Sequence, residues 1–181
     1  MKLLICSDIH GDCECAKFIV DKFHESGCDK ILLLGDILYH GPRNDLPKGY
    51  NPKAVIELLN AEKDNIIAVR GNCDAEVDQM VLDFPILADY ALLSFDGISV
   101  FATHGHKHNK DSNLNLRPGE ILLHGHTHVI AAEPFGNGNF YLNPGSAAIP
   151  KGGNPRSYMV YENRTFTVKD FAGNVITSTK F

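Results

Sequence analysis

The sequence lacks the long apolar segments that insertion into a membrane requires. Its longest uninterrupted apolar runs, such as residues 31–34 and 66–69, are four residues long, whereas a membrane-spanning helix needs about 20. Near the start of the chain, Lys2 is followed by only four apolar residues before Ser7 and Asp8. That run is too short for the hydrophobic region of a signal peptide. We therefore expect no membrane partner.

Cysteine is also scarce. The five cysteines are an odd number and lack the paired spacing of a zinc finger. This usage predicts no disulfide framework and favours a reducing location, the cytoplasm. Cys13 and Cys15 are one residue apart and could form a metal clip. Two thiols at the start of a helix are more often incidental, and we favour that interpretation.

Positive charge is in deficit, since 17 Lys and Arg face 22 Asp and Glu, which gives a formal net charge of −5. This balance argues against a general nucleic-acid surface or an anionic-membrane surface. A small phosphate-bearing substrate remains compatible with the sequence, provided that the charge is inverted locally at one site.

What is present is the composition of one folded domain. The 181 residues are 44% hydrophobic and 22% charged, and a chain of this size buries roughly 70% of its unfolded surface. The sequence contains no internal repeat, low-complexity tract or linker. We therefore expect a single domain over residues 1–181.

Hydrophobic periodicity predicts alternating strands and helices in the first half and mainly strands in the second. The expected helices cover residues 12–26, 53–61, 75–82 and 113–118. The expected strands cover residues 2–7, 31–34, 66–69, 90–95, 98–103, 121–123, 129–134, 140–142, 158–161 and 166–168. Residues 39–52 contain three prolines and two glycines, which predicts a surface loop.

The stretch His-Gly-His-Thr-His at residues 124–128 follows one of these apolar runs. Strand periodicity would place its three histidines on one face. Crowded imidazoles are poorly satisfied in an apolar core, whereas a divalent metal ion accepts their lone pairs. The alternative is a polar strand end that faces water. Ligands from other segments would decide between the two.

Other polar residues also follow apolar runs directly, and most of them adjoin a glycine. The set is Asp8, His10, Asp36, Asn72, His104, His126 and His128. The carboxyl ends of parallel strands gather at one edge of a sheet, so these side chains could converge. Glycines at positions 11, 35, 71, 105 and 125 would allow close approach of the backbone. Seven nitrogen and oxygen ligands exceed one tetrahedral zinc site. They suit two ions bridged by Asp36, through both its oxygens or through one oxygen twice.

The order of these residues resembles that of the calcineurin-like metallophosphoesterase family. The matching blocks are Asp8-Ile9-His10, Gly35-Asp36, Gly71-Asn72, His104 and Gly125-His126-Thr127-His128. The resemblance narrows to the YfcE-like phosphodiesterases through residues 38–44, 68–74, 76–80, 143–146 and 149–155. It implies an α/β (α+β) fold, a four-layer α-β-β-α sandwich of two mixed sheets with a dimetal centre at one edge.

The same resemblance assigns ligands to two metal ions. It implies that one ion is held by Asp8, His10, Asp36 and His128. It implies that the other ion is held by Asp36, Asn72, His104 and His126. Two divalent ions and two aspartates give a net charge of about +2, which would attract phosphate to an otherwise acidic protein.

The implied reaction is hydrolysis of a small phosphodiester. Two metal ions ~3.5 to 4 Å apart would hold a bridging hydroxide that attacks phosphorus. We expect Asp36, Asn72 and His104 to be catalytic as well as metal-binding. Manganese is the expected metal, and iron, zinc or nickel also suit these ligands. The sequence has no glycine-rich nucleotide loop followed by the lysine that phosphoryl transfer would need. It leaves open whether the protein forms a homo-oligomer.

Several further residues are weaker candidates. Cys73 stands where many family members have a histidine that is thought to protonate the leaving oxygen. A thiol is a poorer proton source at neutral pH, so good leaving groups should be favoured, although Cys73 could serve packing alone. His40 and Arg43 could reach a phosphate or remain solvated. His106 could orient the site, or be satisfied by backbone. Asp74 could orient a ligand imidazole or serve a turn.

Two other functions are compatible with the same fold. One is a phosphomonoesterase that acts on a small molecule. The other is a non-catalytic scaffold similar to the retromer subunit, because fold alone does not establish activity. The intact set of ligands weighs against the scaffold.

We also expect the turn at residues 143–146 to form a wall of the pocket.

Overall fold

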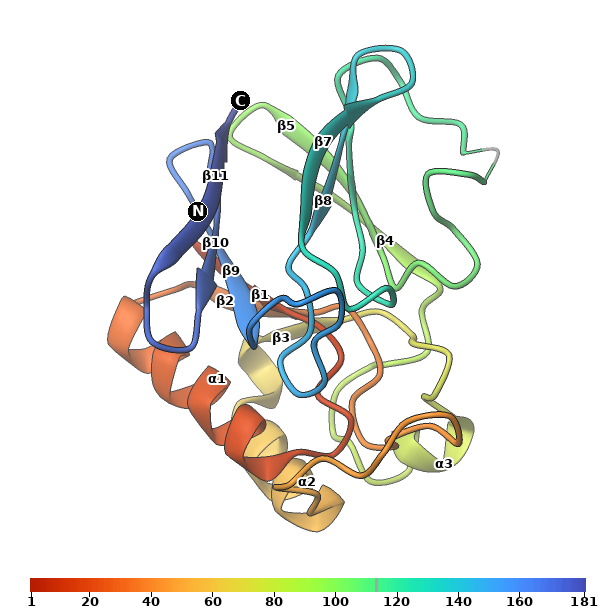
Figure 1. Ribbon diagram of the computed structural model, residues 1–181, viewed down its shortest axis with the longest axis vertical. Helices are drawn as coiled ribbons and strands as arrows, with labels where there is room; N and C mark the ends of the chain where they lie inside the picture. The colour runs from red at the N-terminus through yellow and green to blue at the C-terminus, as the bar shows by residue number, and fades with distance from the viewer. Residues whose placement is uncertain (113) are drawn as a thin grey trace.

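The computed structural model describes residues 1–112 and 114–181, and in this part of the chain two β-sheets pack face to face (Figure 1). The first sheet has the order β11 (Val175–Lys180), β10 (Thr165–Asp170), β9 (Ser157–Glu162), β1 (Leu3–Cys6), β2 (Lys30–Leu33) and β3 (Ile66–Ala68). The second sheet has the order β4 (Tyr90–Phe95), β5 (Ile98–Thr103), β6 (Ile121–Leu123), β8 (Asn139–Asn143) and β7 (Ala131–Phe135).

Both sheets are mixed. In the first sheet, β1, β2 and β3 are parallel, whereas β9, β10 and β11 join by antiparallel pairing. In the second sheet, β5, β6 and β8 are parallel, and β4 and β7 lie antiparallel at the two edges. The parallel strands of each sheet therefore end at a common edge, where the loops that carry polar residues begin.

The two long helices, α1 (Cys13–Ser26) and α2 (Pro52–Ala61), pack together on the outer face of the first sheet (Figure 1). The Asp12 side chain begins α1 by accepting the backbone N–H groups of Glu14 and Cys15, and Gly27 ends it at a φ of 62°. Shorter elements follow α2, namely η1 (Lys63–Asn65) and α3 (Glu76–Gln79). No helix among residues 1–112 and 114–181 is long and apolar enough to cross a membrane.

Strand β1 is buried on both faces, which explains its uninterrupted apolar sequence. Leu4 and Cys6 point into the core beneath the helices. Leu3 and Ile5 point into a second core between the two sheets. The alternation of side chains along the strand thus divides the apolar residues between two cores.

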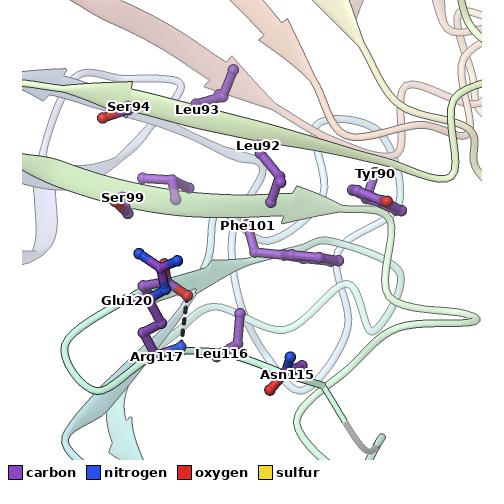
Figure 2. A pocket seen from close by; sticks show the side chains of 11 residues that line it. Tyr90, Leu92, Leu93, Ser94, Ser99, Phe101, Asn115, Leu116, Arg117 and Glu120 are labelled. Carbon is purple, nitrogen blue, oxygen red and sulfur yellow. Dashed lines mark hydrogen bonds between the residues drawn. The ribbon is translucent and has the colours of Figure 1, made fainter.

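The expected sandwich of two mixed sheets is confirmed, and most predicted elements occur within one or two residues of their expected bounds. Strand β11 was not predicted, because its residues alternate between exposed and half-buried and are mostly polar at its carboxyl end. The helix expected at 113–118 is wrong for residues 114–118, which form no helix, and residue 113 lies outside the described residues. Instead, Asn115 and Leu116 lie over the outer face of β4 and β5 (Figure 2).

Candidate metal centre

The predicted ligands follow their strands but do not continue them. β1 ends at Cys6 and β6 ends at Leu123. Five of the ligands have a left-handed backbone, with positive φ angles of 59° at Asp8, 49° at His10, 57° at Asp36, 64° at His126 and 60° at His128. The expectation that strand alternation orients His126 and His128 is therefore wrong, because sharp turns orient them. Such sparsely populated conformations gather at functional sites.

Close approach of these turns requires glycine at two positions in particular. A Cβ atom at Gly125 would collide with the hydroxyl of Ser7 and approach the Asp8 carboxylate to 2.7 Å. A Cβ atom at Gly71 would collide with the carboxylate and backbone nitrogen of Asp36. The glycines beside the ligands thus allow the loop after one strand to contact the ligand of another.

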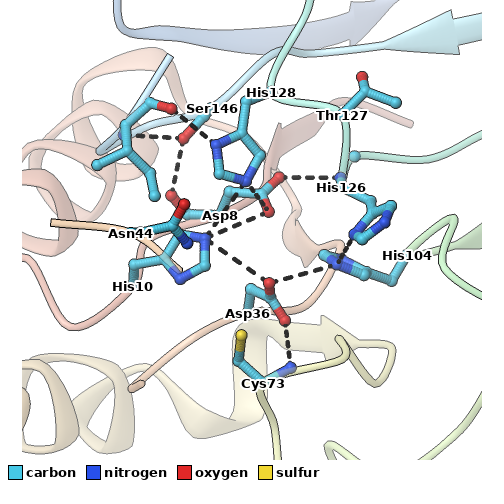
Figure 3. Close-up of polar contacts among 12 residues, drawn as sticks. Asp8, His10, Asp36, Asn44, Cys73, His104, His126, Thr127, His128 and Ser146 are labelled. Atoms are coloured by element: carbon cyan, nitrogen blue, oxygen red, sulfur yellow. Dashed lines mark hydrogen bonds and ion pairs between the residues drawn. The ribbon is translucent and has the colours of Figure 1, made fainter. Parts of the chain in front are cut away.

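The first group of ligand atoms comes from the loops after β1, β2 and β6 (Figure 3). His128 Nε2 lies 3.1 Å from Asp8 Oδ1, and His10 Nε2 lies 3.6 Å from the same oxygen. His10 Nε2 also lies 3.6 Å from Asp36 Oδ2 and 3.4 Å from His128 Nε2. Two imidazole nitrogens and two carboxylate oxygens therefore converge on one point.

The protonation of these imidazoles follows from their other nitrogen. His10 Nδ1 lies 2.8 Å from the carbonyl oxygen of Tyr39, and His128 Nδ1 lies 2.7 Å from that of Ile149. A carbonyl oxygen can only accept, so each Nδ1 donates, and each neutral ring presents a lone pair at Nε2. Asp8 Oδ1 has no hydrogen-bond donor among the described residues. These acceptors require a cation or added protons between them.

The second group is centred on His104, which follows β5. Its Nε2 lies 3.4 Å from Asp36 Oδ2, 3.1 Å from Asn72 Oδ1 and 3.2 Å from His126 Nδ1. Its Nδ1 lies 2.6 Å from the carbonyl oxygen of Leu34, so Nε2 again presents a lone pair. The second group is therefore also a set of acceptors.

Asp36 belongs to both groups through one oxygen. Its Oδ2 faces His10 on one side and His104 on the other. Its Oδ1 instead accepts the backbone N–H of Cys73 at 2.8 Å. If both groups held an ion, Oδ2 would be the oxygen of Asp36 that the two groups share.

The electrostatics of the protein alone are those of a cation site. Burial would raise the pKa of the Asp8 carboxyl, but the neighbouring imidazoles of His10 and His128 hold that pKa well below its usual value. Burial would lower the pKa of His104, but the Asp36 carboxylate raises it to about 9. The buried carboxylates thus raise the pKa of His10 and His104, and positive charge is favoured between these groups.

Comparison with known proteins agrees with this geometry. Residues 1–165 match the family model described as the calcineurin-like phosphoesterase superfamily domain. The chain belongs to this superfamily. As a member, it is a metal-dependent hydrolase of phosphoric esters.

Individual relatives cover nearly the whole phosphoesterase chain. Phosphodiesterase YfcE of Escherichia coli K12 is 46% identical over 168 residues, which span 93% of this chain and 91% of the relative. The probable metallophosphoesterase YsnB of Bacillus subtilis is 29% identical, with 97% and 95% covered. A solved structure of the E. coli phosphoesterase YfcE superposes with a TM-score of 0.96 at 43% identity, and covers 99% of this chain and 98% of that one.

Residues of both ligand groups line a pocket of about 450 Å³. Its wall includes Arg43 and three residues that were assigned no role above, namely Asn44, Thr127 and Lys151. Asn44 and Lys151 lie within segments that carry the family resemblance, so the signal was present without an assigned role. Arg43 and Lys151 bring positive charge to the rim of the phosphoesterase site.

Asp74 has a role different from the imidazole-orienting one considered above. Its buried carboxylate accepts the backbone N–H groups of Asp36 at 2.8 Å, Ile37 at 2.8 Å and Gly71 at 2.7 Å. The residue therefore fixes the loops after β2 and β3. All three of these hydrogen bonds come from backbone N–H groups and none from an imidazole. This is a turn-supporting role beside Asp36.

Of the other weak candidates, His106 lies next to a predicted ligand and His40 does not line the pocket. His40 packs edge-on against Tyr39 and Tyr50 and is not part of the pocket wall. The ring of His106 lies 5.4 Å from that of His104, and burial followed by the charge of His104 lowers its pKa to about 4. His106 is thus a neutral neighbour of the ligands.

Supporting contacts also come from the turn after β8. Ser146 donates its hydroxyl to the backbone oxygen of Asp8 at 3.0 Å. The Asn143 amide donates to the backbone oxygen of Gly125 at 2.9 Å. The turn at 143–146 therefore stabilises the ligand loops through hydrogen bonds to their backbone. It does not line the pocket, so the expectation that it forms a wall is wrong. Cys13 and Cys15 take part in none of the candidate metal groups of the described residues.

Cys73 lies beside Asp36, and its thiol is an unfavourable proton donor. Burial raises the pKa of the thiol, and the neighbouring Asp36 carboxylate raises it further. The thiol therefore stays protonated near neutral pH and holds that proton tightly. This supports the expectation that the enzyme depends on good leaving groups.

Replacing Cys73 by histidine tests that expectation. With an imidazole beside the site, hydrolysis of a diester with a poor leaving group should rise roughly 10- to 100-fold, because general acid catalysis becomes available. Hydrolysis of a p-nitrophenyl ester should change little, since its leaving group needs no proton. Cys73→Ser is the matched control. An unchanged dependence on leaving-group pKa in Cys73→His would mean that residue 73 serves packing alone.

Proposed function

We propose that this phosphoesterase is a phosphodiesterase that holds two divalent ions, with manganese the preferred metal. The observation that supports it is the convergence of lone pairs from His10, His104 and His128 on carboxylate oxygens, without a donor between them. The name of the E. coli relative, a phosphodiesterase, supports the diester as substrate.

We assign the ligands to two ions as follows. Asp8, His10, Asp36 and His128 hold the first ion, and Asp36, Asn72, His104 and His126 hold the second. Histidine, carboxylate and amide oxygen together suit manganese, iron, zinc or nickel. When bound, the ions supply activation of water and neutralisation of the phosphate charge.

The protein's own residues orient and stabilise the substrate. Backbone carbonyl oxygens fix the tautomer of His10, His104 and His128, so that each Nε2 faces the centre. Arg43 and Lys151 on the rim are placed to bind the phosphate oxygens that face away from the ligands. The resulting local positive charge would attract an anion to an acidic protein.

Two further aspects of the proposal have weaker support. All five cysteines are unpaired, which supports a reducing compartment such as the cytoplasm. The alternative of a small-molecule phosphomonoesterase uses the same ligands and remains the rival reaction. The 46% identity to a phosphodiesterase weighs against a non-catalytic scaffold.

The test is metal analysis combined with turnover of matched chromogenic substrates. With added manganese, bis(p-nitrophenyl) phosphate should be hydrolysed with a kcat/KM at least ~10-fold above that of p-nitrophenyl phosphate, and the protein should contain two ions per chain. Faster turnover of the monoester would identify a monoesterase. Absence of turnover of both substrates at full metal content would identify a scaffold.

A further inference from the structure

A second pocket of about 390 Å³ adjoins the metal centre. Its wall includes Tyr39 and Tyr50 from the proline-rich loop, Ile56 from α2, Cys73, and Val77 and Val81 in and after α3. We call it the apolar pocket. Its volume falls within the range of small-molecule sites, ~300 to 1,000 Å³.

Cys73 lies between the apolar pocket and the candidate metal centre. The thiol of Cys73, a nitrogen of His10 and an oxygen of Asp36 all lie within 4.8 Å of one another. The backbone oxygen of Tyr39 accepts His10 Nδ1 at 2.8 Å, so another wall residue also contacts a ligand. A molecule bound at the ligands therefore has the apolar pocket as its immediate neighbour.

The wall of the apolar pocket presents hydrocarbon to solvent. Tyr39 is 41% exposed, Val77 is 64% exposed and Val81 is 43% exposed. The one carboxylate in the wall, that of Asp78, is engaged by the backbone N–H of Ala75 at 2.8 Å. Apolar side chains that gather around a hollow beside a polar centre are typical of a site for the apolar part of a ligand.

The two neighbouring pockets thus differ in chemistry. The metal pocket carries the charged groups of Arg43 and Lys151 together with the ligands. The apolar pocket offers aromatic and branched aliphatic side chains. A substrate that fits both has an anionic phosphate joined to an apolar group.

We propose that the apolar pocket binds one ester group of the substrate, an aromatic or branched aliphatic alcohol residue, while the phosphate lies at the metal centre. This inference rests on the proposed function and narrows it to phosphodiesters with at least one apolar ester group. Sugars and charged alcohols would gain nothing from this wall. Val77 and Val81 are then specificity-determining residues.

Two phosphonates separate the contribution of the apolar pocket from that of the metals. Phenylphosphonate and methylphosphonate carry the same anionic group and differ only in the apolar substituent. On the manganese-loaded enzyme, phenylphosphonate should inhibit with a KI roughly 10-fold or more below that of methylphosphonate, because its ring is buried. A ratio within twofold of one would overturn the proposal.

Variants locate the effect. In Val77→Asn/Val81→Asn the ratio should fall to about one through a weaker KI for phenylphosphonate, with the KI for methylphosphonate unchanged. Val175→Asn, at a valine that is 60% exposed on β11, is the matched control and should keep the wild-type ratio. Metal content and the KI for methylphosphonate report whether the double variant is intact. An unchanged ratio in that variant also overturns the proposal.

The outcome is distinguishable from a failure of the proposed function. If the enzyme hydrolyses no diester but the same ratio, measured as dissociation constants by calorimetric titration, responds to the variants, the apolar pocket stands and the assigned reaction does not. If the diester is hydrolysed but the ratio is insensitive to Val77 and Val81, the reaction stands and the apolar pocket does not.

Discussion

Replacing Asp36 by alanine is expected to abolish ester hydrolysis, with a fall in kcat/KM of roughly 10³-fold or more, equivalent to ~4 kcal/mol of transition-state stabilisation. The physical reason is that Oδ2 of this residue faces both ligand groups, so its loss weakens both proposed ion sites together. Metal content should fall with activity. Metal analysis of the purified variant and turnover of a chromogenic diester measure the two effects.

Two companion variants make this result interpretable. Asp36→Asn keeps the shape of the side chain and an oxygen for the N–H of Cys73, but removes the charge, and it should also lose activity. Asp45→Ala removes an exposed aspartate from the loop that follows Asp36 and should behave like the wild type. Full activity in Asp36→Ala would refute the assignment of a bridging role.

Removal of divalent metal by a chelator should also reduce hydrolysis to background, and added manganese should restore it. The unfolding free energy of the stripped protein should be lower, by about 3 kcal/mol for each ion, than that of protein with free metal at 100 times its Kd, because the ions bind only the folded state. Thermal unfolding with and without manganese measures this difference. Retained activity after complete stripping would exclude a metal-dependent reaction.

The same experiment carries a dependence on pH. The pKa of His104 rises from an ordinary value of 6.5 to about 9 in the metal-free protein. The contact between protonated His104 and Asp36 therefore stabilises the folded, metal-free protein. Its contribution to the free energy of unfolding is fully present below pH 6.5 and is lost as the pH rises through 9. A metal ion must displace this proton, so apparent metal affinity should fall about tenfold for each unit of pH below 9.

Chemistry was easier to predict than local backbone. Asp36 was expected to bridge because a carboxylate has two oxygens, and the structure places it between the two groups. The left-handed turns at His126 and His128 were not predicted, since periodicity describes strands and says nothing of φ after they end. Apolar runs revealed the buried strands, whereas the mainly polar β11 gave no such signal.

Contacts that depend on loop packing were also beyond the sequence. Lys151 is far from Asp36 in the chain and enters the same pocket only because of how its loop folds. The role of Asp74 depends on three backbone N–H groups that point at its carboxylate. No pattern of residue types encodes the direction of a backbone N–H, so the turn-supporting role could not be separated from an imidazole-orienting one.

The bonds that hold the ligand loops have a consequence for how the enzyme acquires its metal. Backbone bonds join Asp8 to Gly35 at 3.1 Å and His10 to Asp36 at 2.9 Å, while another joins Ala148 to Asp8 at 3.2 Å. These backbone hydrogen bonds support the left-handed turns that carry Asp8 and His10. The ligand loops are therefore preorganised, so we expect ions to exchange without refolding of the chain and the bound metal to follow the relative abundance of free ions in the surroundings.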